Sequence, residues 1–171
     1  ACGTRSNVVP GTATALLAGD WRVQAAEAFD SADEDCAIET ALEGENTRVT
    51  VTGVPAHAST PEKGKNAGKM LLRVLAQLGI GGAPVALLDE AAGEGDDGVN
   101  LGIAGSDAVS GRLTINLGLL SAGEGRLSVT FDCRYPVFFD DRTISATVQK
   151  RLAPAGFVME PTHASHPHHV P

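Results

Sequence analysis

Five histidines are the side chains of this chain best suited to metal binding or charge stabilisation, and four of them fall within its last nine residues. A catalytic two-metal site needs several His, Asp or Glu ligands around ions about 3.5 to 4 Å apart. A proline-rich terminal segment is more often a solvated connector than a set of ligands with the geometry that zinc requires. We therefore interpret this segment as a solvated connector, with a metal site as the alternative. Its histidines are His163, His166, His168 and His169.

The remaining histidine, His57, stands alone in the middle of the chain. A predicted strand leaves through Gly53 and Pro55 into a loop that presents His57, and Thr60 then caps a predicted helix with Pro61 in its first turn. An exposed histidine held between two ordered elements suits a charge-stabilising role. An ordinary surface histidine is the alternative.

Other common catalytic motifs are missing from the sequence. No Ser or Cys nucleophile occupies a strand-turn-helix elbow, and no phosphate loop with Gly-Lys-Ser or Gly-Lys-Thr is present. The glycines of residues 64–69 are better explained as a helix entry than as an anion site.

Composition narrows the class of protein. The chain has 171 residues, a hydrophobic content of 43%, a net charge of −8 and an aromatic content of 4%, which fit a globular domain and argue against nucleic-acid binding. No run approaches the roughly 20 apolar residues of a membrane span, and no signal peptide is visible, so we expect neither membrane attachment nor export. Three widely spaced cysteines favour a reducing cytoplasm over a disulfide framework.

The elements that must position His57 follow from apolar periodicity. Residues 113–119 and 127–133 alternate in polarity around a glycine-rich turn, Ser121 to Gly125, and predict an antiparallel hairpin. A helix is predicted over 140–152 with a short strand at 157–159, and upstream a strand over 49–52 precedes a helix that ends at Gly79.

This order predicts an α+β fold: a ferredoxin-like split βαβ antiparallel sheet with its helices on one face. Residues 80–111 hold eight of the twenty glycines and predict an irregular insertion with one helical turn at most. Residues 5–43 repeat a strand, helix, strand pattern, so we divide the chain into a partial second repeat, 1–47, and a ferredoxin-like core, 48–171.

Four segments together resemble the co-catalytic zinc peptidase family that includes aminoacylase, carboxypeptidase G and bacterial carnosinase-type dipeptidases. The most specific is Gly-Val-Pro-Ala-His-Ala-Ser-Thr-Pro, followed by Gly-Lys-Asn-Ala. With the other three it points to the monomeric dipeptidase branch. These three are Gly3 to Pro10, Val109 to Gly118 and Phe131 to Pro136.

The resemblance implies that this chain is the lid inserted into a larger catalytic domain, which lies outside this sequence and would hold two zinc ions. It implies that His57 stabilises the oxyanion, that Arg134 binds the C-terminal carboxylate of a dipeptide, and that Asn7 binds the substrate backbone. The expected partners are a dipeptide and the catalytic domain of the same chain, in a monomer. The start of the chain departs from the family pattern, because Ala1-Cys2-Gly3 replaces a paired glycine before threonine.

Two of these features have alternative explanations. Arg134 ends a predicted strand on its polar face, where its guanidinium could bind a carboxylate through two hydrogen bonds or pair with Asp132 or Asp140. A free-standing ferredoxin-like module that binds a ligand, or a dimerisation domain, would also fit the fold. An inserted lid should bring Gly3 and Val170 close together.

Overall fold

The computed structural model describes residues 1–30 and 34–160. The four C-terminal histidines and Val170 lie outside the described residues. The interpretation of the histidine segment as a connector and the expected closeness of the two chain ends therefore stay predictions.

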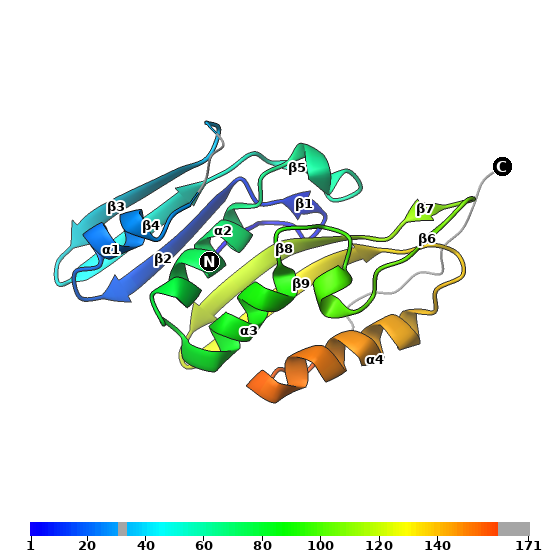
Figure 1. Ribbon diagram of the computed structural model, residues 1–171. Coiled ribbons are helices and arrows are strands. Elements are labelled where there is room, and N and C mark those ends of the chain that lie inside the picture. The colour runs from blue at the N-terminus through cyan, green and yellow to red at the C-terminus, as the bar shows by residue number, and fades with distance from the viewer. Residues whose placement is uncertain (31–33, 161–171) are drawn as a thin grey trace.

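A three-stranded antiparallel sheet forms the N-terminal part of the molecule (Figure 1). Its strands β2 (Thr12–Ala18), β3 (Ala37–Glu43) and β4 (Asn46–Thr52) follow the order β2-β4-β3, with α1 (Arg22–Glu27) between β2 and β3. Val49 and Val51 are buried while Thr50 and Thr52 on the other face are not, as expected for a half-buried strand.

The predicted hairpin is confirmed as β8 (Thr114–Gly123) and β9 (Arg126–Arg134). Its turn is only two residues long, because Glu124 and Gly125 both adopt positive φ angles (50° and 74°) that suit a tight hairpin turn.

The expected alternation of β8 is wrong at Leu119. Leu117 pairs with Phe131 but Leu119 pairs with Thr130, so Gly118 is an extra residue in a β-bulge. Beyond the bulge the faces exchange, and Leu120 is buried in place of Leu119.

Residue Cys2 links the two groups of strands. It forms antiparallel bridges to Ala13 in β2 and to Leu120 in β8. The α+β class with antiparallel strands is confirmed, whereas the neighbour order of a ferredoxin-like unit is not seen, because β4 pairs with β2 and β3. The domain boundary at residue 47 stays a prediction.

Helix α2 (Ala67–Gln77) packs on β2, β4 and β8, and buries Leu71, Leu72 and Val74. Its N-cap is Asn66, whose side chain accepts a hydrogen bond from the Lys69 N–H.

The helix expected to start at Thr60 is wrong. Pro61–Lys63 form one 3-10 turn, η1, without a side-chain cap from Thr60, and Gly64 then returns the chain to an extended conformation.

The expectation of an irregular segment over 80–111 is also wrong. Gly82–Ala92 form a helix of 11 residues, α3, that lies beside α2 (Figure 1). Gly81 precedes the helix and Gly93 follows it, both with positive φ, so these two glycines mark its ends and do not interrupt it. Val85 and Leu88 are buried and hold α3 against the core. The rest of the segment contains η2 (Val99–Leu101) and a small hairpin of β6 (Ser106–Asp107) and β7 (Gly111–Arg112).

The last helix, α4 (Asp141–Leu152), is confirmed, with Asp140 as N-cap, and is followed by the 3-10 turn η3 (Ala153–Ala155). The predicted strand at 157–159 is wrong. The Gln149 side chain donates to the Phe157 carbonyl and accepts from the Met159 N–H, so a helix side chain takes the backbone groups that a strand partner would use. Among the described residues, no helix is both long and apolar enough to cross a membrane.

Candidate active-site surface

His57 lies in a two-stranded ribbon formed by β1 (Val8–Val9) and β5 (Ala56–His57). In this ribbon Val8 pairs with His57, and the Ala58 N–H donates to the Asn7 carbonyl at 3.0 Å. Asn7 and His57 are both exposed. The structure therefore brings together two of the three residues that the sequence analysis selected, although 49 residues separate them in the chain.

The hydrogen bonds of the His57 ring determine which nitrogen carries its proton in the neutral form. The Ser59 backbone N–H donates to His57 Nδ1 at 3.2 Å, and the Ser59 hydroxyl lies 2.7 Å from the same nitrogen. Because a backbone N–H can only donate, Nδ1 is the acceptor and the proton lies on Nε2. In the part of the chain that the structure describes, Nε2 has no hydrogen-bond partner, which leaves an N–H able to meet developing negative charge.

The side-chain amides of Asn116, which is buried, and Asn66, which is partly buried, connect this ribbon to the core. Asn116 is 1% exposed, and its Nδ2 donates to the carbonyls of Ser6 and Val8, both at 3.0 Å. Its Oδ1 accepts from Asn66 Nδ2 at 3.1 Å, and Asn66 Nδ2 also donates to the Leu117 carbonyl at 2.9 Å.

Sequence reasoning did not select Asn66 or Asn116 as functional residues. The available signal was their place in the Gly-Lys-Asn-Ala and Thr-Ile-Asn-Leu-Gly segments, next to the residues that were selected.

Arg134 lies at the end of β9, opposite Thr114. Its Nε is 3.2 Å from Asp132 Oδ1, with side-chain exposures of 45% and 19%, so the ion pair that the sequence analysis kept as an alternative is formed. Within the described residues Arg134 has no hydrogen bond to Asn7 or His57. Because Asn116 pairs with Asp132, Arg134 lies at the same end of the β8–β9 hairpin as Asn116.

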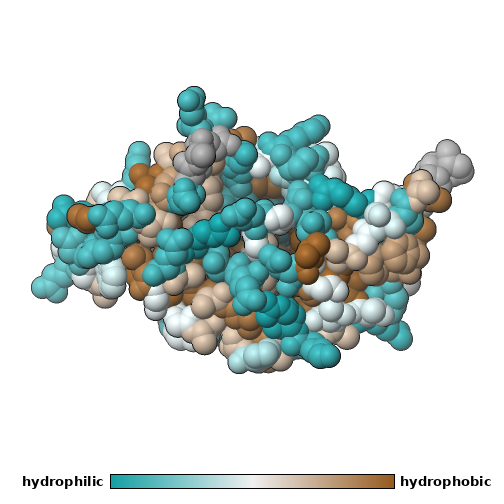
Figure 2. Space-filling view, viewed as in Figure 1, coloured by the Kyte–Doolittle hydropathy of each residue, from teal (hydrophilic) through white to brown (hydrophobic). Residues whose placement is uncertain are grey.

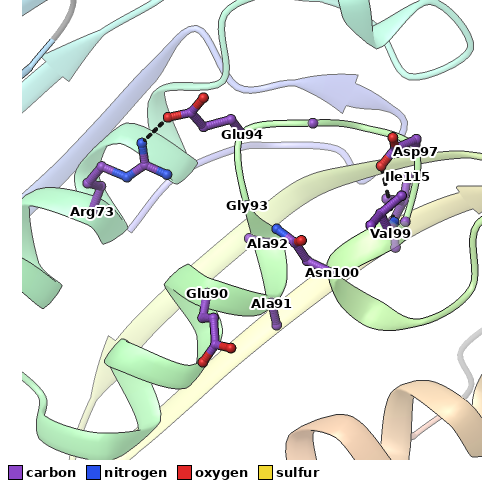
Figure 3. A pocket seen from close by; sticks show the side chains of 12 residues that line it. Arg73, Glu90, Ala91, Ala92, Gly93, Glu94, Asp97, Val99, Asn100 and Ile115 are labelled. Carbon is purple, nitrogen blue, oxygen red and sulfur yellow. Dashed lines mark hydrogen bonds and ion pairs between the residues drawn. The ribbon is translucent and has the colours of Figure 1, made fainter.

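A separate cavity of about 460 Å³ lies between the end of α3, η2 and Arg73 (Figure 3). Of its charged side chains, Arg73 and Glu94 form an ion pair at 2.6 Å, and Glu90 pairs with Arg151 at 2.8 Å. Next to it, burial lowers the pKa of Lys69, whose amine donates to the Gly95 carbonyl. Neither Asn7, His57 nor Arg134 lines this cavity, so it is distinct from the candidate site.

Within residues 1–30 and 34–160, no group of three or more His, Cys, Asp or Glu side chains is arranged to hold a metal ion. The donor set found near His57 is one imidazole with amides and hydroxyls, which suits hydrogen bonding to a substrate and does not fit a zinc site.

Comparison with known proteins gives two matches. Residues 46–157, which include His57, Asn116 and Arg134, match the family model described as "Peptidase dimerisation domain". The chain is also 30% identical to a Bacillus subtilis (strain 168) protein named "Putative dipeptidase YtjP" over 175 aligned residues, covering 98% of this chain and 37% of that protein. The family match covers well over half of the sequence, and the chain belongs to the peptidase dimerisation domain family.

Proposed function

We propose that this chain is the lid of a zinc-dependent dipeptidase, which closes over a bound dipeptide. In this proposal His57 stabilises the oxyanion of the tetrahedral intermediate, Asn7 binds the substrate backbone, and Arg134 binds the C-terminal carboxylate. The similarity to a protein named as a dipeptidase supports the peptidase class. Because the chain spans 37% of that relative, the rest of the parent would supply the remainder of the active site.

The observation that carries the proposal is that Asn7 and His57 are exposed residues of adjoining segments: Val8 pairs with His57, and the Ala58 N–H donates to the Asn7 carbonyl. With Nδ1 engaged by Ser59, His57 presents Nε2–H as a preset donor, which needs no reorganisation when negative charge develops. The Asn7 side chain carries both a donor and an acceptor, the two functions needed to bind a peptide unit. Together they form a small surface that can bind a peptide backbone next to its reacting carbonyl.

To bind the substrate carboxylate, Arg134 has to exchange its present partner, Asp132, for that carboxylate. An exposed ion pair such as Arg134–Asp132 stabilises by about 0 to 1 kcal/mol. A substrate carboxylate that binds the guanidinium fork through two hydrogen bonds in a closed site would therefore displace or share Asp132 at little cost.

The two zinc ions of the proposal belong to the part of the parent outside this chain, because the described residues do not form a metal site. The roles proposed for His57, Asn7 and Arg134 use only donors that this chain provides. We further propose a cytoplasmic location, which fits three free cysteines, and a monomeric parent.

The test uses the parent enzyme with His57→Ala. Removing one oxyanion donor should lower kcat by about 100- to 1,000-fold and leave the metal content unchanged. Lys63→Ala, an exposed change in the following turn, is the matched control and should leave kcat unchanged. An unchanged kcat in His57→Ala would reject the catalytic role, and loss of metal would make His57 a ligand.

Dimerisation is the second candidate function, and the description of the matching family favours it. The exposed apolar side chains Val109, Val137 and Phe138 add support. Apolar residues gather at the right-hand end of the molecule in Figure 2, where Figure 1 places β6 and β7. Sedimentation of the chain over a range of concentrations distinguishes the lid function from dimerisation. A monomer at all concentrations supports a lid that does not dimerise, and a stable dimer supports a dimerisation function.

A further inference from the structure

The side-chain amides of Asn116 and Asn66 use every N–H donor that they carry in hydrogen bonds within the chain. Both Nδ2 hydrogens of Asn116 are used, on the Ser6 and Val8 carbonyls, and both Nδ2 hydrogens of Asn66 are used, on Asn116 Oδ1 and the Leu117 carbonyl. Asn66 Oδ1 accepts from the Lys69 N–H. These contacts leave only one orientation of each amide that satisfies every partner.

The two carbonyls that Asn116 binds flank Asn7. Ser6 and Asn7 form a turn, in which the Val8 N–H donates to the Arg5 carbonyl at 3.4 Å. The Asn7 carbonyl accepts from the Ala58 N–H in the His57 loop. The segment that carries Asn7 is therefore held both by the Asn116 side chain and by the backbone of the His57 loop.

The pair is anchored in closely packed elements of the molecule. Asn66 caps α2, whose first residues Ala67 and Gly68 are fully packed, and a Cβ added at Gly68 would lie 2.6 Å from Cys2 Sγ. Asn116 lies in β8, which is buried on both faces over residues 114–117. A displacement of the Asn7–His57 ribbon relative to the core therefore requires these hydrogen bonds to break.

We propose that Asn116 and Asn66 are positioning residues. They fix the positions of Asn7 and His57 relative to the bound substrate and relative to each other. This inference rests on the proposed function. Neither amide touches the substrate in this scheme. Their effect passes through the Ser6 and Val8 carbonyls to Asn7, and through the β1–β5 pairing to His57.

The test compares Asn66→Asp and Asn116→Asp in the parent enzyme. Asn66→Asp keeps an oxygen that caps α2 but loses both donors, and Asn116→Asp loses both donors to the Ser6 and Val8 carbonyls. A misplacement of about 1 Å costs about 100-fold in rate, so each variant should lower kcat by about that factor without loss of metal. Hydrogen exchange of residues 5–10 and 55–60 should accelerate. Asn66→Asp decides the question if Asn116→Asp does not fold.

Thr47→Val is the matched control. The Thr47 hydroxyl is also buried and also bridges two backbone groups, the Trp21 N–H and the Gly19 carbonyl, but at the far end of β4. This variant should lower stability and leave both kcat and exchange of the ribbon unchanged. An equal loss of kcat in Thr47→Val would overturn the inference, because any weakening of the fold would then have the same effect.

A second arm introduces Asn66→Asp into the double variant Asn7→Ala, His57→Ala. If Asn66 acts through these two residues, its effect on kcat should largely disappear there, and a full effect would overturn the inference. If His57→Ala alone leaves kcat unchanged, the proposed function fails, and ribbon exchange in Asn66→Asp still decides the positioning. If His57→Ala lowers kcat but Asn66→Asp changes neither kcat nor exchange, the inference fails and the proposed function stands.

Discussion

Replacing Arg134 in the parent enzyme gives the sharpest test of substrate recognition. Removing one partner of a buried, doubly hydrogen-bonded charge pair costs about 2 to 5 kcal/mol. In the wild-type free enzyme Arg134 already pairs with Asp132, and giving up this exposed pair to bind the substrate costs up to about 1 kcal/mol. The difference leaves about 1 to 5 kcal/mol, so Arg134→Ala should lower kcat/KM for a dipeptide by about 5- to 5,000-fold. Arg134→Lys should not restore it, because lysine lacks the planar fork.

The assay compares a dipeptide with the same dipeptide amidated at its C-terminus. The amide never forms the ion pair, so Arg134→Ala should change its kcat/KM much less. Arg126→Ala, an exposed change at the other end of β9, is the control and should affect neither substrate. Asp132→Asn should leave the dipeptide rate unchanged or raise it, since it frees the guanidinium. An equal loss on both substrates in Arg134→Ala would show that Arg134 supports the lid and does not bind the carboxylate.

Three further predictions concern the chain itself. Purified alone, with zinc or manganese added, it should hydrolyse no dipeptide; turnover above a metal blank that disappears in His57→Ala would contradict the lid proposal. Gly118→Ala should lower the free energy of unfolding by about 1 to 3 kcal/mol, measured by urea denaturation, because its Cβ would lie 2.2 Å from the Ser6 carbonyl oxygen. An unchanged midpoint would show that the Ser6 backbone does not pack against Gly118. Burial, followed by the charge of Asp132, raises the pKa of Cys133 to about 12, so Cys36 should be alkylated well before Cys133 at pH 8. As the folded pKa is raised above the usual value of 9.0, this thiol should make the protein less stable as the pH rises from about 9 to 12; equal labelling of the two thiols would refute the burial.

Much of the fold could be predicted because its elements depend on near neighbours. The strand over residues 127–133, the cap of α4 at Asp140 and the stop of α2 at Gly79 depend on residues two to four positions apart, and each appears in the structure. The failures occur where a distant contact overrides the local pattern. Gln149 takes the backbone groups of the predicted strand at 157–159, and the packing of Val85 and Leu88 turns a glycine-rich segment into α3.

The candidate site divides in the same way. The sequence by itself determined the chemical types: a histidine in a loop between ordered elements, an arginine at the end of a strand, and motif segments shared with a peptidase family. Only the tertiary structure decided which of them are neighbours, because the pairing of Val8 with His57 and the hydrogen bonds from Asn116 to the Ser6 and Val8 carbonyls join segments about 50 to 110 residues apart. It also decided the His57 tautomer, through the hydrogen bond from the Ser59 N–H to Nδ1, and it placed Arg134 in an ion pair with Asp132. A hydrogen bond depends on position and direction to within fractions of an ångström, and those are fixed by the packing of the whole core and not by the order of residues along the chain.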